Sequence, residues 1–371
     1  MNPSILLVGN FLSASGGARG VCEELALRLA VGGMRVITTS AQPARIPRLF
    51  DMLWTVHRQR ARYAVAQVDV YSGPAFIWAE AVCAWLKRLG KPFILTLHGG
   101  NLPDFARRHA RRVRRLLASA DAVTTPSRFL LERMSGHGAE LHLLPNALEL
   151  GRYPFRLRER AAPSLIWLRA FHEIYNPALA TEVVKLLVGQ FPKIHLTMVG
   201  PDKGDGSLVR ARALAAKWGV ANRVSFPGAV SKEQVPEWLQ RADIFLNTTN
   251  IDNTPVSVLE AMACGLCVVS TNVGGLPYLL KSEQTALLVP PKDAEAMSAA
   301  VRRLLVESDL PPRLSQSART QVEAHDWRVI LPQWQELFRT LARRVSPNRT
   351  TLNDNSISCA RGLGKFADRA P

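Results

Sequence analysis

Short apolar runs alternate with helical patterns along most of the chain, and this alternation limits the fold more than any other feature. Each run is rich in β-branched and large apolar residues, as in strands buried on both faces of a parallel sheet. The expected strands are 4–9, 35–39, 66–71, 92–97, 121–125, 140–144, 165–168, 194–199, 223–226, 243–247, 267–270 and 286–289. Helical patterns fill the intervals, among them 18–31, 74–89, 104–118, 127–134 and 231–241. The chain is therefore predicted to be an α/β protein.

A polar stretch over residues 152–163 interrupts this alternation and predicts a linker. With 371 residues, the chain is long enough for two domains that each bury a core. We expect two Rossmann-like domains, one over 1–150 and one over 151–330, which face each other across a central cleft at the carboxyl ends of their strands. A C-terminal helix is expected over 331–345. The polar tail 346–371 has no hydrophobic period and is expected to be disordered.

The charge of the chain is strongly basic, with 47 Lys and Arg against 30 Asp and Glu and a net charge of +17. The densest cluster lies in the helical pattern 104–118, where the arginines fall within an arc of about 160°. Three interpretations compete: a solvated helix face, a surface for anionic lipid headgroups, and a nucleic-acid site. Nucleic acid is not expected, because no known binding motif and no interleaved aromatic residues accompany the arginines. We assign the expected membrane surface to Arg107, Arg108, Arg111, Arg112 and Arg115.

The sequence also indicates the compartment of the protein and whether it binds a metal. No apolar run is long enough to form a membrane-spanning helix, and no signal-peptide pattern precedes the first strand. We therefore expect a cytoplasmic protein, peripheral on the inner face of the membrane. Cys264 and Cys267 form a C-x-x-C pair without a second pair, so we interpret them as small buried residues. No metal and no cofactor are expected, since no D-x-D pair or His/Asp cluster is visible.

Three strand ends carry candidate functional residues whose interpretation stays open. Gly16 and Gly17 lie between a strand and a helix, where glycines let backbone N–H groups approach a phosphate or simply form a tight turn. His98 ends a buried strand, the position at which α/β enzymes place ligand contacts. Arg169 follows the strand 165–168, where a guanidinium suits either a diphosphate or a salt bridge.

The fourth and most informative place follows the strand 243–247. A loop carries Asp252, and a helix is predicted to begin near Pro255, because proline is favoured in the first turn. The N–H groups around Val256 and Ser257 would then form an anion site at the helix N-terminus. Glu260 lies about one turn inside the helix, so the two carboxylates would flank one ligand. The alternative is a surface aspartate and a helix-capping glutamate.

The stretch from Asp252 to Glu260, which continues as Ala-Met-Ala-Cys-Gly-Leu-Cys-Val-Val-Ser-Thr-Asn-Val-Gly-Gly-Leu-Pro277, resembles the donor-site signature of the retaining GT-B glycosyltransferases of family 4. That signature places seven residues between two acidic ones. The resemblance covers about residues 5–344 and is most specific over 243–290. It implies a GT-B fold and an enzyme that transfers a sugar from a UDP- or GDP-sugar to a glycan or glycolipid acceptor, with retention of configuration.

The resemblance also implies roles for individual residues. Catalytic positions would be His98, which contacts the donor sugar, Arg169, which holds the diphosphate, and Asp252, which binds sugar hydroxyls. Glu260 would take the ribose hydroxyls. The other donor-binding positions would be Gly16, Gly17, Asn253, Thr254, Pro255, Val256 and Ser257. No dedicated general base is evident, and in this class the leaving phosphate can itself take the acceptor proton.

Two departures from the family pattern stand out. The first acidic position is usually Glu and is Asp252 here. A lysine usually follows the arginine by five residues in a Lys-Gly or Lys-Asn pair, whereas this chain has Ile174 at that place and Tyr175 where the pair would begin. Two alternatives remain open: another GT-B nucleotide-sugar enzyme such as a 2-epimerase, and a non-catalytic sugar-nucleotide binding protein.

Overall fold

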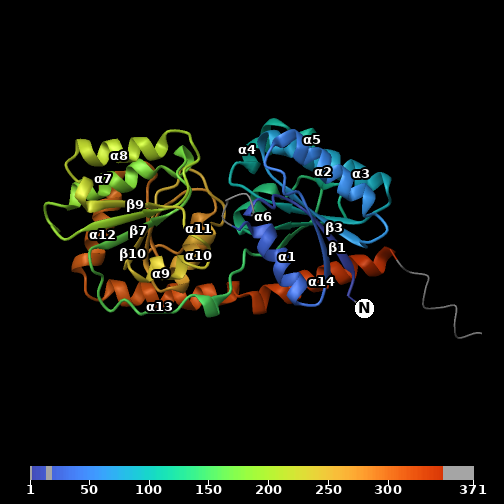
Figure 1. Cartoon of the computed structure of the whole chain (residues 1–371). Helices are drawn as coiled ribbons and strands as arrows, with labels where there is room; N and C mark the ends of the chain where they lie inside the picture. Colours follow the sequence, from blue (N-terminus) through green and yellow to red (C-terminus); the bar gives the residue numbers. More distant parts are fainter. Residues whose placement is uncertain (1, 14–18, 346–371) are drawn as a thin grey trace, which may run out of the picture.

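The computed structural model describes residues 2–13 and 19–345, which form two α/β domains that lie side by side (Figure 1). The predicted GT-B fold class, with two Rossmann-like domains, is confirmed. Gly16, Gly17 and the predicted disordered tail 346–371 lie outside the described residues. Each domain contains one parallel six-stranded sheet with helices on both faces.

The N-terminal sheet has the strand order β2-β1-β3-β4-β5-β6, with every neighbouring pair parallel. Its strands are β1 (Ser4–Val8), β2 (Arg35–Thr39), β3 (Val65–Val70), β4 (Phe93–Leu97), β5 (Ala122–Thr125) and β6 (Leu141–Leu143). Central strands such as β4 are buried along their whole length, because helices cover both faces. Strands are added on one side of β1 (β2) and then on its other side (β3 to β6), while all of them stay parallel. This change in the order of addition creates a switch point at the carboxyl ends of β1 and β3.

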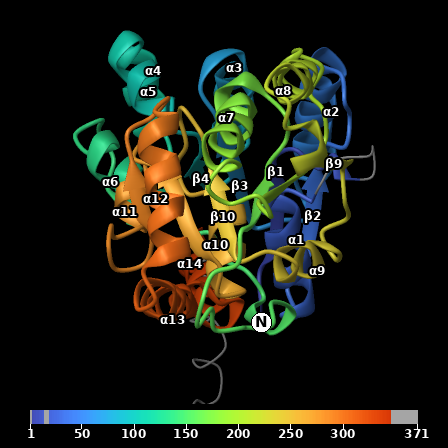
Figure 2. The same cartoon turned by 90° about the vertical axis from the view of Figure 1, so that its left-hand side faces the viewer.

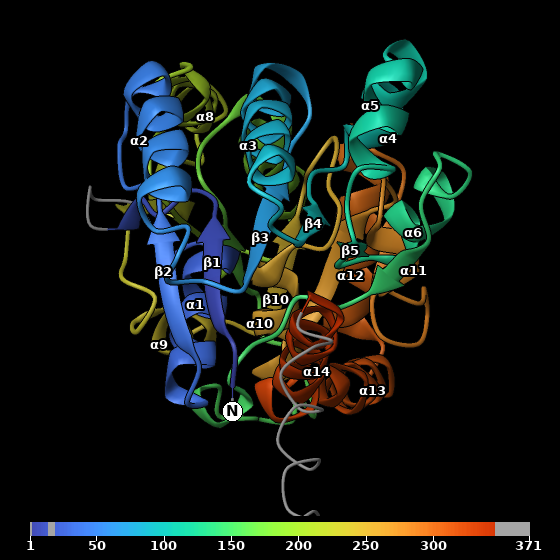
Figure 3. The same cartoon turned by 90° about the vertical axis from the view of Figure 1, so that its right-hand side faces the viewer.

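Helices cover this sheet in two layers. One layer contains α2 (Arg45–Arg58), α3 (Phe76–Arg88), α4 (Leu102–Arg108), α5 (Ala110–Leu117) and α6 (Arg128–Met134). Figure 3 shows α2, α3 and the α4–α5 pair next to one another on this side of the domain. The other layer contains α1 (Val21–Val31) and α14 (Trp327–Val345). Helix α2 was not predicted from the sequence.

The C-terminal sheet has the order β12-β11-β10-β7-β8-β9 and is also parallel. Its strands are β7 (Ser164–Leu168), β8 (His195–Val199), β9 (Val224–Gly228), β10 (Ile244–Asn247), β11 (Cys267–Thr271) and β12 (Leu287–Val289). All twelve strands of the described residues match predicted ones. The switch point of this sheet lies between β7 and β10. Strands β8 and β9 follow on one side of it, and β11 and β12 on the other.

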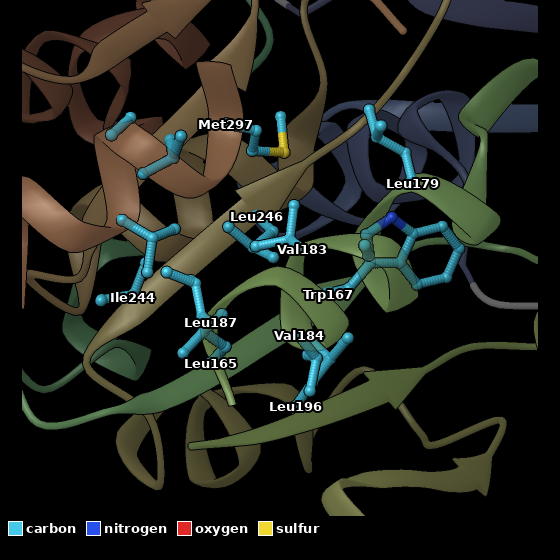
Figure 4. Close-up of a cluster of buried hydrophobic side chains, with 14 of the residues drawn as sticks. Leu165, Trp167, Leu179, Val183, Val184, Leu187, Leu196, Ile244, Leu246 and Met297 are labelled. Carbon is cyan, nitrogen blue, oxygen red and sulfur yellow. The ribbon is translucent and has the colours of Figure 1, made fainter. Parts of the chain in front are cut away.

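Two cores fill the C-terminal domain. Helices α7 (Pro177–Leu187), α8 (Ser207–Lys217) and α12 (Ala294–Val306) cover one face, and Figure 2 shows them from that end of the molecule. Figure 4 shows Leu165 and Trp167 of β7 packed with Val183, Val184 and Leu187 of α7 in this core. Helices α9 (Val235–Gln240), α10 (Val256–Ala263), α11 (Leu276–Leu279) and α13 (Leu310–Val322) cover the other face.

The last described helix returns to the N-terminal domain. Helix α14 follows α13 and runs beneath the N-terminal sheet (Figure 1). Its side chains Ile330, Trp334 and Phe338 are at most 5% exposed and share a core with β1 and α1. Helix α14 therefore completes the N-terminal domain, and burial of its apolar face joins the two domains.

The predicted linker is packed rather than loosely solvated. Residues 154–163 contain no helix or strand, but the Arg158 side chain is fully buried. Its Nε donates to Asp243 at 3.1 Å, and its Nη1 and Nη2 donate to the carbonyls of Cys264 and Ala242 at 2.7 and 2.8 Å. Cys264 and Cys267 are both buried with unbridged thiols, as predicted, and burial raises their pKa values to about 11 and about 12.

Candidate active site

Arg169 and Asp252 meet across the switch point of the C-terminal sheet. Arg169 directly follows β7, and Asp252 lies in the loop after β10, the neighbouring strand. Nη2 of Arg169 donates to Oδ2 of Asp252, and the two side chains are 16% and 12% exposed. Within residues 2–13 and 19–345, the buried Nε of Arg169 has no hydrogen-bond partner. The pair is thus fixed in place, and the buried Nε–H of Arg169 is a donor that no described residue uses.

An aromatic ring supports the guanidinium from one face. Cζ of Arg169 lies 4.2 Å from the ring centroid of Tyr175, the residue that stands where the family's lysine pair would begin. The arrangement is a cation–π contact, in which the ring quadrupole attracts the charge without neutralising it. The chain therefore orients Arg169 at this place but supplies no second cation from position 175.

Glycines crowd the backbone around Asp252. A Cβ on Gly100 would lie 2.6 Å from the carbonyl oxygen of Asp252, and a Cβ on Gly274 would lie 2.1 Å from it. Gly274 also has a φ of +55°, which other residues rarely adopt. Because Gly100 follows His98 in the N-terminal domain, this contact brings the predicted His98 and Asp252 segments together across the cleft.

The loop between Asp252 and α10 contacts the N-terminal domain directly. Oγ of Ser127 donates to Oδ1 of Asn253, while Nδ2 of Asn146 donates to the carbonyl of Thr254 at 2.9 Å. The Thr254 hydroxyl faces the carbonyl of Pro126 at 3.4 Å. The side chains of Asn253 and Thr254 therefore join the two domains in this structure.

Helix α10 begins at Val256, immediately after Pro255, as the sequence predicts. The N–H groups of Val256 and Ser257 belong to the first turn, where no intrahelical acceptor exists. Oγ of Ser257 is buried, and no described residue bonds to it. Unpaired donors at a helix N-terminus form a ready site for an anion such as a phosphate.

Glu260 lies inside α10 and is only 2% exposed. Its Oε1 accepts from the hydroxyl of Tyr153 at 2.7 Å and from Nζ of Lys232, which lies in the loop after β9. Burial and the charge of Glu260 raise the pKa of Tyr153 far above its usual value, so this hydroxyl stays a donor. Lys232 therefore compensates the charge of the Glu260 carboxylate, and both donors hold it in place. It does not cap the helix.

A cavity of about 70 Å³ lies beside this cluster, and both domains contribute to its wall. Its lining residues are Arg19, Gly20, Val21, Glu24, Arg28, Ala147, Leu148, Glu149, Arg152, Tyr153, Lys232, Val256 and Trp327. Four of them are cations, and each pairs with a carboxylate: Arg28 with Glu24 and Glu149, Arg19 with Glu24, Arg152 with Glu233 and Lys232 with Glu260. Val256, Lys232 and Tyr153 connect this cavity to the Glu260 site.

On the N-terminal side, His98 follows β4 and lies beside Asp69 of β3. Nε2 of His98 is 2.9 Å from Oδ1 of Asp69, and the two side chains are 10% and 3% exposed. Since a carboxylate only accepts, Nε2 carries the proton and Nδ1 is left for another partner. Gln67 also donates to Asp69 at 2.8 Å, and the ring of Tyr71 stacks on His98 with a 5.0 Å centroid separation.

The arginine-rich segment 104–118 differs from the prediction in the number of its helices. The single helix expected over 104–118 is two helices, α4 and α5, because His109 leaves the helical conformation at φ −127° and ψ 40°. Arg107, Arg108, Arg111, Arg112 and Arg115 are all exposed. Arg112 pairs with Glu80 of α3, and Arg107 pairs with Asp104 of its own helix.

Asp69, Lys232, Tyr153 and Tyr71 were not predicted as site residues. Asp69 is the only one with a usable signal, since it is a carboxylate next to the end of a buried strand. Lys232 lies in the helical pattern predicted over 231–241, but the helix α9 begins only at Val235, and no sequence signal indicated a role for this lysine. Tyr153 lies in the predicted linker, 107 residues from its partner Glu260.

Two further searches concern the described residues alone. None of the helices in residues 2–13 and 19–345 is both long and apolar enough to span a bilayer. No cluster of three or more His, Cys, Asp and Glu side chains within these same ranges is arranged to bind a metal ion.

Each of the two domains matches a model of a known protein family. Residues 160–321 match the family model described as Glycosyl transferases group 1, and residues 15–152 match that of Glycosyltransferase Family 4. Each of the two domains thus matches a glycosyltransferase family model, and both domains are similar to glycosyltransferase domains.

The individual relatives have low sequence identity to this chain. A D-inositol 3-phosphate glycosyltransferase from Streptomyces scabiei is 27% identical over 157 residues, which cover 41% of this chain and 35% of that protein. The chain thus spans about a third of the length of this relative. A GDP-mannose-dependent alpha-(1-6)-phosphatidylinositol monomannoside mannosyltransferase from Mycolicibacterium smegmatis is 27% identical over 257 residues, 64% of this chain and 65% of that protein.

Solved structures support the fold. Sucrose-phosphate synthase from Thermosynechococcus elongatus superimposes with a TM-score of 0.76 at 20% identity, covering 91% of this chain and 99% of that chain. The Anabaena protein HepE in complex with UDP and glucose superimposes with a TM-score of 0.71 at 15% identity, covering 91% and 100%.

Proposed function

We propose that this protein transfers a sugar from a nucleotide-sugar donor to a glycan or glycolipid acceptor, with retention of configuration. The observation that carries the proposal is the Arg169–Asp252 pair beside the N-terminus of α10. It joins a guanidinium with an unused N–H, a carboxylate and an anion-binding helix end at one switch point. These groups match a diphosphate and the sugar attached to it.

In this proposal Arg169 and the first amides of α10 bind the diphosphate and stabilise the charge that develops as it leaves. Asp252 accepts hydrogen bonds from sugar hydroxyls with the lone pairs that Arg169 leaves unused. Glu260 binds the ribose through Oε2, because Tyr153 and Lys232 already occupy Oε1. His98 reaches the donor sugar from the N-terminal domain, with Nδ1 as a hydrogen-bond acceptor.

The names of two similar proteins support the donor class that we propose. One curated relative is GDP-mannose-dependent, and one structural neighbour is described in complex with UDP and glucose. We therefore assign a UDP- or GDP-sugar as donor. The acceptor side would face an anionic membrane, with Arg107, Arg108, Arg111, Arg112 and Arg115 on lipid headgroups. Each such arginine contributes about 1 kcal/mol near an anionic surface.

A panel of labelled UDP-, GDP- and ADP-sugars tests the activity. The full chain is incubated with each donor, with and without a lipid extract that contains glycolipid and inositol-phospholipid acceptors, and Arg169→Ala serves as the control. Labelled product that needs both donor and extract, and that the control does not form, supports the proposal. Nuclear magnetic resonance of the product then reports the anomeric configuration.

The other readings give different outcomes in the same assay. Epimer or free sugar formed without an acceptor would indicate an epimerase. Donor binding without any turnover, in the presence of the extract, would indicate a sugar-nucleotide binding protein. Either result would contradict the transferase proposal.

A further inference from the structure

Helix α2 exposes three large apolar side chains on one face. Ile46, Phe50 and Trp54 are 72%, 69% and 60% exposed. Their spacing of four residues places them on one side of the helix, within an arc of about 80°. We call these three residues the α2 stripe.

The α2 stripe does not contribute to the protein core. Met52 and Val56 lie on the opposite side of the same helix, are 3% and 0% exposed, and pack in the N-terminal core. An outer helix of a globular domain ordinarily has polar residues on its solvent face. A contiguous exposed apolar patch usually marks a contact with a membrane or with another protein.

Exposed arginines lie at both ends of the helix that carries the α2 stripe. Arg45 and Arg58, the first and last residues of α2, are exposed. On the same side of the domain, α3 packs against α2, and the Arg112–Glu80 ion pair links α3 to the arginine-rich α5. Figure 3 shows α2, α3 and the α4–α5 pair in one row on this side of the domain.

We propose that the α2 stripe inserts into the headgroup region of an anionic lipid bilayer. Aromatic and aliphatic side chains on one face, with arginines beside them, are the composition of helices that lie in a membrane interface. A second copy of this chain is a poorer occupant, because stripe-to-stripe contact would bring the basic helices of two molecules with net charge +17 together. The proposal does not depend on the transferase activity, because none of the three stripe residues lines the cavity beside Glu260.

Vesicle sedimentation tests the insertion. The triple variant Ile46→Ser/Phe50→Ser/Trp54→Ser should bind vesicles of phosphatidylglycerol and phosphatidylcholine at least about tenfold more weakly than the wild type. Val209→Ser is a matched control, since Val209 lies on α8 of the other domain and is 68% exposed. It should bind like the wild type. Circular dichroism verifies that all variants are folded.

Salt dependence separates insertion from charge attraction alone. At about 1 M salt the Debye length falls to about 3 Å, so attachment through the arginines is suppressed. A vesicle-bound fraction that persists in the wild type and is lost in the triple variant supports insertion. In addition, lipids brominated near the headgroup should quench fluorescence of the wild type more than that of Trp54→Phe.

Two results would overturn the proposal. The first is a triple variant that binds vesicles like the wild type at both low and high salt. The second is a wild type that is dimeric in sedimentation velocity while the triple variant is monomeric, because the stripe would then be an interface between two copies. Absence of turnover on any nucleotide sugar would contradict the proposed function and leave the vesicle results unchanged.

Discussion

Nε2 of His98, at the end of β4, donates to Oδ1 of Asp69, near the end of β3, over 2.9 Å. The two strands are neighbours in the N-terminal sheet, so their carboxyl ends present both side chains at one edge. The hydrogen bond selects the imidazole tautomer, and the stacked ring of Tyr71 limits its rotation. Asp69 therefore positions His98 toward the cleft.

Asp69→Ala should lower kcat about tenfold to a hundredfold with little change in the donor KM. The reason is that a misplaced catalytic group chiefly affects the transition state. Steady-state kinetics with the donor found in the sugar panel measures both constants. Thr96→Val is the control, because Thr96 accepts from Gln67 in the same buried network without contacting His98. Equal kcat values for wild type and Asp69→Ala would exclude the positioning role.

Arg169→Ala should weaken binding of the donor's nucleoside diphosphate by about 2 to 5 kcal/mol, because it removes a mostly buried charge and leaves Asp252 unpaired. Calorimetry with UDP and GDP measures the change. Arg210→Ala removes the same charge from an exposed position of α8 and should leave the affinity unchanged. An unaltered affinity in Arg169→Ala would remove Arg169 from the donor site.

Tyr175→Lys should tighten nucleoside-diphosphate binding. The substitution places a second cation next to Arg169, one residue after the place of the family's usual lysine, and removes the ring that lies 4.2 Å from the guanidinium. Tyr175→Leu removes the ring without adding charge and separates the two effects. If the lysine variant binds UDP and GDP no better than the leucine variant, the diphosphate does not pass near residue 175.

Substitutions of the two carboxylates should differ in kind. Glu260→Gln removes a ribose contact that is the same in ground and transition states, so it should mainly raise the donor KM. Asp252→Asn touches the sugar on which charge develops, so it should mainly lower kcat. Asp252→Glu has the family's usual length and should retain more activity than Asp252→Asn. Unchanged transfer kinetics in both folded neutral variants would place the donor site elsewhere.

Protein stability should decrease as the pH falls below about 6.5. Burial lowers the pKa of His325, whose Nδ1 lies 2.9 Å from the carbonyl of Asn146. Because the pKa of His325 is lower in the folded than in the unfolded state, the unfolded chain binds a proton more readily as the pH falls. The contribution of the neutral His325 to the free energy of unfolding is therefore complete above the unfolded-state pKa and is lost as the pH falls below it. Thermal unfolding at about pH 7.5 and about pH 5.5 should show a smaller loss of Tm in His325→Asn. An equal loss in both proteins would assign the pH dependence to other groups.

The strands could be predicted from the sequence, because a parallel sheet covered on both faces requires continuous apolar runs of the kind seen in β4 and β11. The start of α10 at Val256 could also be predicted, since proline at 255 is a local signal. Helix α2 was missed although its sequence carries an amphipathic pattern, with Arg48, Asp51 and Thr55 on one side and the large apolar residues on the other.

Pairings between distant residues were decided only by the tertiary structure. Arg169 and Asp252 are 83 residues apart, and they meet because the chain order places β7 beside β10. The sequence identified each of them as a candidate but could not choose between a salt bridge and a ligand contact. Similarly, Lys232, in the loop after β9, and Glu260 of α10 are 28 residues apart in the sequence and meet only in the folded structure. Local patterns determine which segments become helices and strands, whereas the order of strands in the sheet determines which side chains share a site.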